Sequence, residues 1–164
     1  MKPIKIIIAI ISTAILVALD QWSKAFATNY LMGAPSVVVI ENFLSLTYHR
    51  NAGAAFGILQ GGRWFFLIFA VVILVAISIY FVKLPHDRVH NAIRCSLVLI
   101  AAGGIGNSID RLINSFVVDF LRFDFINFPI FNVADIYVVA GTILMGILVI
   151  FFVKDEPAKK EDKE

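Results

Sequence analysis

Four stretches of the chain are long enough and apolar enough to cross a lipid bilayer. An α-helix rises about 1.5 Å per residue, so about 20 residues span a hydrocarbon core of ~30 Å. The first uncharged run, residues 6–19, is too short alone, and we expect its helix to continue through Asp20 and Lys24. The predicted membrane helices cover residues 6–27, 64–82, 95–112 and 135–153.

The segment between the first two predicted helices, residues 29–62, has a different pattern. Residues 36–40 and 43–48 are β-branched and aromatic with mixed polarity, and several glycines follow them. This pattern is typical of short strands and loops. We therefore expect a small β-rich segment outside the hydrocarbon, which touches the membrane surface through Phe43, Leu44 and Phe56.

Composition assigns the chain to the membrane class. Hydrophobic residues make up 60% of the chain and charged residues 16%, which is more apolar than a soluble domain normally is. The predicted fold is therefore a mainly α membrane protein with four transmembrane helices.

Cys95 is the single cysteine, which excludes an internal disulfide. A net charge of +2 gives no indication of a nucleic acid partner, and the charged residues 154–164 are predicted to be a disordered tail.

The positive charges predict the orientation of the four helices. Lysine and arginine concentrate in the loops on the cytoplasmic side of membrane proteins. With four spans, one side carries Lys2, Lys5, Lys83, Arg88, Arg94, Lys154, Lys159, Lys160 and Lys163. The other side carries Lys24, Arg50, Arg63, Arg111 and Arg122. Both termini are therefore predicted to be cytoplasmic, and Asn51 and residues 107–135 to share the outer face.

The end of the first apolar run bears on whether the N-terminus is a signal peptide and on what Asp20 and Lys24 do. A signal peptide is the alternative for this N-terminus, but the run leads into Asp20 and Lys24 instead of a cleavage site of small residues. A retained helix is favoured. Asp20 and Lys24 are spaced i, i+4, so they can pair on one helix face while Lys24 snorkels to the interface. The spacing fits a structural ion pair and a direct role equally well.

Polar residues gather between the third and fourth apolar runs. They are Asn107, Asp110, Arg111, Asp119, Arg122, Asp124, Asn132 and Asp135. Ionisable groups at the edge of a bilayer are costly and usually mark a pathway or a reaction site. Asp119 has apolar neighbours, which raise a carboxyl pKa, whereas Asp135 begins a helix, whose dipole favours the ionised form. Opposite influences on two nearby carboxyls suit an acid/base pair that activates water.

Structural interpretations compete with this hypothesis. Asn132 and Asp135 have the spacing of a helix cap, and Asn51 fits an ordinary turn. Asp110 and Arg111 fit the end of a helix. Arg122 and Asp124 fit an exposed ion pair, which contributes little to stability. From spacing alone, a small transporter or a structural subunit remains an alternative to an enzyme. His86 and His90 share a helix face, but no further ligands lie near them, so no metal site is expected.

Five motifs together resemble lipoprotein signal peptidase, also called signal peptidase II. They are D-Q-W-S-K at residues 20–24, N-A-G-A-A-F at 51–56, G-G-I-G-N-S-I-D-R at 103–111, V-V-D-F at 117–120 and F-N-V-A-D at 131–135. They occur in the family's order and cover essentially the whole chain. One departure is visible, because residues 114–116 precede V-V-D-F where a glycine is common in the family. That departure concerns the local turn.

The resemblance implies an aspartic peptidase whose catalytic pair is Asp119 and Asp135. The residues that match positions around the substrate are Asn51, Gly53, Asn107, Asp110, Arg111 and Asn132. Asp20 and Lys24 match a supporting position. The β-rich segment at 29–62 resembles the family's extracytoplasmic cradle, which clamps the substrate. No metal and no organic cofactor is implied.

The resemblance also implies the biological setting. The family acts in the bacterial cytoplasmic (inner) membrane, where it cuts prolipoproteins before a cysteine modified with diacylglycerol. The implied partners are those prolipoproteins and membrane lipids. The enzyme is expected to be a monomer and to bind globomycin-type peptide inhibitors.

Overall fold

The computed structural model describes residues 3–53 and 61–153. Residues 54–56 of the second motif, with the expected membrane contact of Phe56, lie outside the described residues, as does the expected disordered tail at 154–164. Four helices form the body of the protein: α1 (Pro3–Leu31), α2 (Arg63–Lys83), α3 (Arg88–Asn114) and α4 (Val133–Phe152). Each is long and apolar enough to cross a membrane, which confirms the predicted fold class.

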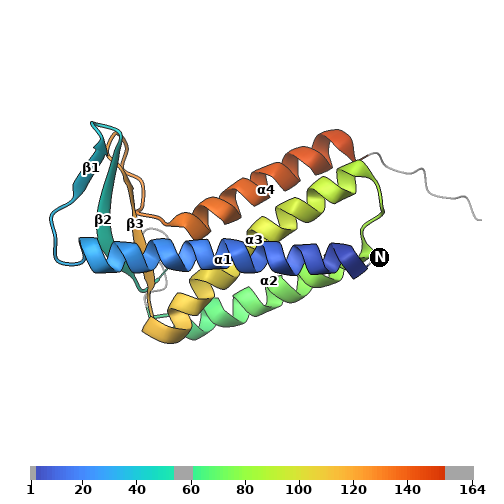
Figure 1. The fold of residues 1–164 in the computed structure, drawn as a ribbon, viewed down its shortest axis with the longest axis horizontal. Coiled ribbons are helices and arrows are strands. Elements are labelled where there is room, and N and C mark those ends of the chain that lie inside the picture. The colour runs from blue at the N-terminus through green and yellow to red at the C-terminus, as the bar shows by residue number, and fades with distance from the viewer. Residues whose placement is uncertain (1–2, 54–60, 154–164) are drawn as a thin grey trace, which may run out of the picture.

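The helices run side by side, with a small sheet at one end and the N-terminus at the other (Figure 1). Helix α3 begins well before residue 95, where the apolar run starts, because Asp87 caps it. The Asp87 side chain accepts a hydrogen bond of 2.9 Å from the backbone N–H of His90. A capped first turn can remain polar because it lies at the edge of the apolar core. The connection between α2 and α3 is therefore shorter than the predicted spans, which ended at 82 and resumed at 95, implied.

Close packing centres on α3, where glycines allow neighbouring helices to approach. A Cβ on Gly103 would overlap the backbone oxygen of Ala134 in α4, and one on Gly106 would overlap the carboxylate of Asp20 in α1. Gly103 and Gly106 therefore permit close packing, whereas Gly104 has nothing within 4 Å of an added Cβ.

A three-stranded antiparallel sheet lies against this end of the bundle. Its strands are β1 (Val37–Ile40), β2 (Leu44–Asn51) and β3 (Val117–Phe123), in the order β1-β2-β3. Strands β1 and β2 confirm the two that were expected. Strand β3 follows α3 and was not anticipated, because V-V-D-F has no alternation of polar and apolar residues. The pairing aligns Asn51 with Val117, so the second and fourth motifs meet in one sheet.

The turn before β3 accounts for the departure from the family pattern. Ser115 ends α3 with φ +68°, in the left-handed region that favours glycine. Its backbone N–H donates to the carbonyl of Arg111 across 3.2 Å, and its hydroxyl accepts from Arg63 across 2.7 Å. Helix α3 thus continues past Asp110 to Asn114, and Arg111 lies in its last turn, so Asp110 and Arg111 do stand near a helix end.

Candidate active site

The two aspartates come from different elements, and asparagine side chains hold both. Asp119 lies in β3 with only 1% of its surface exposed. Asn132 donates from Nδ2 to Oδ1 of Asp119 across 2.6 Å, and Asn51 donates to Oδ2 across 2.9 Å. Both carboxylate oxygens therefore accept an amide N–H, which fixes the orientation of the group.

Asp135 lies in the first turn of α4 and takes part in its cap. Its Oδ2 accepts from the backbone N–H of Asn132 across 3.1 Å, while the Asn132 side chain accepts from the Asp135 N–H across 3.1 Å. This reciprocal pair is a capping box, so the cap interpretation is confirmed. The other oxygen of Asp135 accepts from Asn107 across 2.8 Å. The cap and the aspartate pair are thus one structure, because Asn132 binds both carboxylates.

Burial alters the acidity of Asp119. Removal from water raises the pKa of its carboxyl from the usual 3.8 to about 6. The hydrogen bond from Asn51 lowers this pKa, the negative charge of Asp135 raises it, and Asn132 and Lys24 lower it to a smaller extent. The expectation that apolar neighbours raise this pKa is confirmed. A carboxyl with a pKa near neutrality can both release and accept a proton.

A buried ion cluster supports the aspartate pair from behind. Lys24 lies 2.9 Å from the Asp20 carboxylate and 3.2 Å from that of Asp110. The predicted pair of Asp20 and Lys24 is therefore present, but Lys24 is 3% exposed and does not snorkel to the interface. It stays buried because Asp110 and Asn107, both on α3, supply further partners for its ammonium group.

The same carboxylates hold the backbone of the elements that carry the site. Asp20 accepts from the N–H of Ala134 across 2.9 Å, and Asp110 accepts from the N–H of Val118 across 3.0 Å. The two N–H groups belong to the residues that directly precede Asp135 and Asp119 in the chain. The ion cluster therefore positions β3 and the start of α4.

Gln21 belongs to this cluster and was not singled out by sequence reasoning. Its amide nitrogen lies within hydrogen-bond distance of Asp20 (3.2 Å), Asp110 (3.0 Å) and the carbonyl of Gly106 (3.1 Å). It thus bridges the two carboxylates that flank Lys24. Its place inside the D-Q-W-S-K motif was the signal that could have identified it.

Asn51 and Arg111 organise the segment that enters the site from β2. The side chain of Asn51 accepts from the N–H of Gly53 across 3.0 Å, so the turn interpretation is confirmed along with the contact to Asp119. Arg111 donates to the carbonyl of Gly53 across 3.1 Å and stacks over the ring of Phe66 at 4.6 Å. Residues from β2, α2 and α3 therefore converge at this point.

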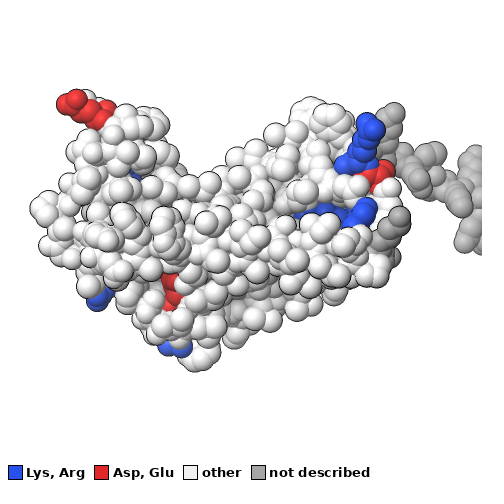
Figure 2. Space-filling view, in the orientation of Figure 1, with Lys and Arg blue, Asp and Glu red and all other residues white. Residues whose placement is uncertain are grey.

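A cavity of about 670 Å³ opens beside the aspartate pair. Six of the ten predicted site residues line it: Asn51, Gly53, Asn107, Arg111, Asp119 and Asp135. The other four, Asp20, Lys24, Asp110 and Asn132, lie behind its wall and hold the lining residues. Figure 2 shows a hollow without charged side chains between the sheet and α4.

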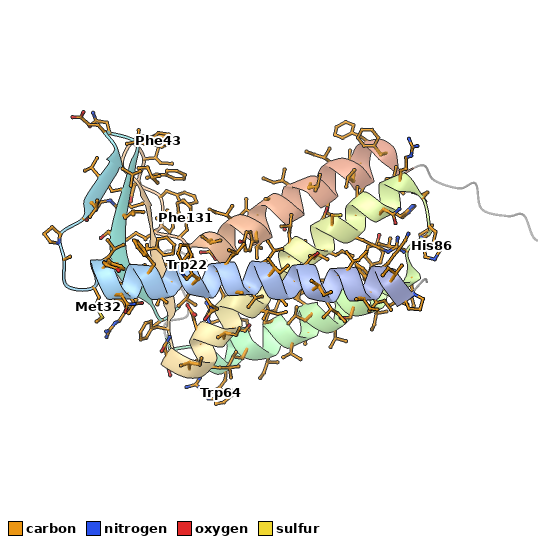
Figure 3. The ribbon with its side chains drawn as sticks, viewed as in Figure 1. Trp22, Met32, Phe43, Trp64, His86 and Phe131 are labelled. Atoms are coloured by element: carbon orange, nitrogen blue, oxygen red, sulfur yellow. The ribbon has the colours of Figure 1, made fainter. Side chains whose placement is uncertain are left out.

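The rest of the cavity wall is apolar and aromatic. Phe123, Phe128 and Phe131 form one side, and Phe131 points between the sheet and α4 (Figure 3). Ile136, Val139, Ala140 and Ile143 line it along α4. Sequence reasoning did not assign these phenylalanines to the site, although the phenylalanine-rich run from 116 to 131 was visible. The cavity thus has a polar end at the aspartates and an apolar end along α4.

No metal centre accompanies this cavity in the described part of the chain. Residues 3–53 and 61–153 contain no group of three or more His, Cys, Asp or Glu side chains that could hold a metal ion. His90 instead contacts Asp87, 2.5 Å away.

Comparisons with known proteins match this architecture over most of the chain. The family described as signal peptidase (SPase) II matches residues 12–152. The lipoprotein signal peptidase of Caldanaerobacter subterraneus subsp. tengcongensis is 44% identical over 144 residues, which cover 87% of this chain and 96% of that protein. The lipoprotein signal peptidase of Enterococcus faecalis is 40% identical over 160 residues, with 96% and 95% covered.

Two solved structures have the same fold. A bacterial membrane enzyme determined by the in meso method at 2.3 Å resolution aligns with a TM-score of 0.77 and 34% identity, covering 95% of this chain and 93% of that one. A second, at 1.9 Å resolution, aligns with a TM-score of 0.78 and 35% identity, covering 88% and 94%.

Proposed function

Because this multi-pass membrane protein belongs to the signal peptidase II family, we propose that it is an aspartic endopeptidase that removes signal peptides from prolipoproteins. The cut falls before the cysteine that carries diacylglycerol. One observation carries the proposal: Asp119 and Asp135, from separate elements, line one cavity and share Asn132 as a hydrogen-bond donor.

The aspartate pair would activate water for attack on the peptide bond. Two close carboxyls that share a proton can divide the work of a general base and a general acid. One aspartate, in its carboxylate form, takes a proton from water while the water oxygen attacks the scissile carbonyl carbon. The other aspartate, in its protonated form, gives a proton to the departing amine of the cysteine. The pKa of Asp119, raised to about 6 by burial, supports proton exchange near neutral pH.

The remaining lining residues would bind the substrate. Asn51, Asn107 and Arg111 present polar groups at the same end of the cavity as the aspartates, where they can bond the extended backbone of the signal peptide. Gly53 allows that backbone to approach closely. Asn132, Asp110, Asp20 and Lys24 act by holding these groups in place.

The apolar channel supports the proposed lipid specificity. Ile136, Val139 and Ile143 line the cavity along α4 and are exposed on the protein surface, where they would meet the bilayer. Acyl chains on the substrate cysteine can lie against this face while the peptide reaches the aspartates. A substrate anchored in the membrane would thus arrive sideways from the bilayer. Globomycin-type peptide inhibitors are proposed to occupy the same cavity.

The orientation and the working unit follow from the same features. We infer that the protein lies in the bacterial cytoplasmic membrane with both termini in the cytoplasm, because its basic loops fall on the side away from the sheet. The sheet and the active site would then lie at the outer face. A monomer suffices, because one chain supplies both aspartates and all the asparagines that bind them.

The decisive experiment is cleavage of a diacylglyceryl-modified prolipoprotein by the purified protein in detergent micelles. Asp119→Asn and Asp135→Asn should each lower the rate by about a thousandfold or more, because each removes a carboxylate while nearly preserving shape. Asp124→Asn is the matched control, since Asp124 directly follows β3 and does not line the cavity. It should leave the rate unchanged.

Two results would contradict the proposal. If the folded wild-type protein does not cut the lipidated substrate, the peptidase assignment is wrong. If Asp119→Asn and Asp135→Asn cut as fast as Asp124→Asn, the aspartates serve another role, such as the proton relay of a transporter.

A further inference from the structure

A second cavity lies at the end of the bundle opposite the sheet. It has a volume of about 480 Å³ and separates the first half of α1 from the first half of α3. Its wall is largely apolar, with Ile8 and Leu16 of α1 facing Val98 and Leu99 of α3. Two cations, Lys5 and Arg94, also line it.

No residue in the first half of α1 is buried against the rest of the protein. The buried residues of α1 are Asp20, Lys24, Ala27 and Leu31, all in its second half. The hydrophobic cluster at this end is formed by Leu84, Ile93 and Leu97 with residues of α2 and α4 around them, and none of its members is on α1. The first half of α1 therefore faces α3 across a space that protein side chains do not fill.

Arg94 is a buried charge with neutral partners. Its side chain is 4% exposed and donates to the carbonyls of Phe81 (3.3 Å), Leu84 (2.6 Å) and Pro85 (3.0 Å). It also donates to the side-chain oxygen of Asn91 across 3.1 Å. These bonds use four of the five N–H groups of the guanidinium. Among residues 3–53 and 61–153, Arg94 has no ion-pair partner.

Lys5 brings a second charge to the same side of the cavity. Its ammonium group donates to Oδ1 of Asn91 across 2.8 Å, the same atom that Arg94 binds. Two of its three N–H groups remain available. Lys5 likewise lacks an ion-pair partner within the described residues. The nearby carboxylate of Asp87 is paired with His90.

We propose that this cavity binds one anionic phospholipid from the leaflet on the N-terminal side of the membrane. The phosphate oxygens accept hydrogen bonds from the free N–H groups of Lys5 and Arg94, and an acyl chain fills the apolar space between α1 and α3. Charge complementarity favours this occupant, because the two cations on this apolar cavity lack a counter-ion among the described residues, and basic pockets between membrane helices suit anionic headgroups. Figure 2 shows that Lys and Arg side chains gather at this end.

Native mass spectrometry of the full-length protein tests the proposal. The protein is released from detergent after incubation with equimolar phosphatidylglycerol and phosphatidylcholine that carry the same acyl chains. Wild type should retain one phosphatidylglycerol about fivefold or more in preference to phosphatidylcholine. Lys5→Gln should reduce this preference about fivefold, because one cation near a headgroup contributes about that factor. Lys5→Arg should keep it.

Two further variants separate the site from a general basic surface. Lys83→Gln removes a charge at the same end of the bundle from an exposed residue outside the cavity, and it should retain lipid like wild type. Ser12→Phe keeps both cations but fills the apolar part of the cavity, and it should lose the bound lipid.

Several outcomes would overturn the proposal. Equal retention of the two lipids would exclude selectivity for an anionic headgroup. An equal effect of Lys83→Gln and Lys5→Gln would indicate a diffuse basic surface. Displacement of the bound lipid by inorganic phosphate at a comparable concentration would identify a simple anion site, as would unchanged binding in Ser12→Phe.

Discussion

The ammonium group of Lys24 donates to Oδ1 of Asn107 across 2.9 Å, and the Nδ2 of the same asparagine donates to Asp135 across 2.8 Å. One amide therefore connects a buried cation to an aspartate of the proposed catalytic pair. Asn132 extends the connection, because its Nδ2 lies 3.2 Å from Asn107 and 2.6 Å from Asp119. The ion cluster and the aspartate pair form one hydrogen-bonded network.

Removal of the buried cation should destabilise the whole protein. Lys24→Met leaves the carboxylates of Asp20 and Asp110 buried without a counter-charge, which should cost roughly 3–5 kcal/mol of unfolding free energy. The apparent unfolding temperature in detergent measures this loss. Arg122→Gln is the control, because it breaks the more exposed pair with Asp124 and should hardly change that temperature. Similar effects of the two variants would show that burial of the Lys24 cluster is unimportant.

Asn132 has two separable roles, in the helix cap and at Asp119. Asn132→Ser keeps an oxygen that can accept from the Asp135 N–H but removes the amide that donates to Asp119. We expect its peptidase rate to fall by about tenfold or more. Asn132→Ala should lose both activity and about 1 kcal/mol of cap energy. If Asn132→Ser cuts as fast as wild type, the amide does not contribute to the reaction.

The pKa of Asp119 predicts how stability depends on pH. Burial raises this pKa to about 6, above the usual 3.8, so the folded chain binds the proton more tightly than the unfolded chain. This tighter proton binding adds roughly 3 kcal/mol to the free energy of unfolding. The contribution is fully present below about pH 4 and is lost as pH rises through about 6.

Comparison with Asp119→Asn isolates this effect. In Asp119→Asn, the new side-chain amide points an N–H group at the N–H donor of Asn51 or of Asn132. This lowers the unfolding free energy by an amount that does not change with pH. Between pH 4 and 7.5, wild type should therefore lose unfolding free energy relative to Asp119→Asn. A constant difference between the two proteins over this range would contradict the raised pKa.

The glycines of α3 should differ sharply in their tolerance of a methyl group. Gly103→Ala pushes against the Ala134 carbonyl, next to Asp135, and should lower the peptidase rate by about tenfold or more because the first turn of α4 must shift. Gly104→Ala meets nothing within 4 Å and should be neutral or slightly stabilising. Rates and unfolding temperatures of both variants test this contrast. Equal tolerance would mean that the helices can separate without cost.

Local physical requirements explain what could be predicted without a structure. A bilayer demands about 20 residues for each helix, so the four spans could be predicted from the apolar runs once the first was extended through Asp20 and Lys24. Strands β1 and β2 followed from β-branched and aromatic residues, and the cap at Asn132 from its spacing to Asp135. The polar residues were conspicuous because charged groups are rare at the edge of a membrane.

The sequence alone therefore determined the four spans, the two strands and the set of polar residues at one end of the protein. Tertiary structure decided which of them meet. Asn51 reaches Asp119 because β2 pairs with β3, and Lys24 is buried because α3 brings Asp110 and Asn107 to it. These partners are 68 to 86 residues apart in the chain. No local periodicity or propensity encodes such contacts, since the first depends on strand pairing and the second on how closely Gly106 lets α1 approach α3.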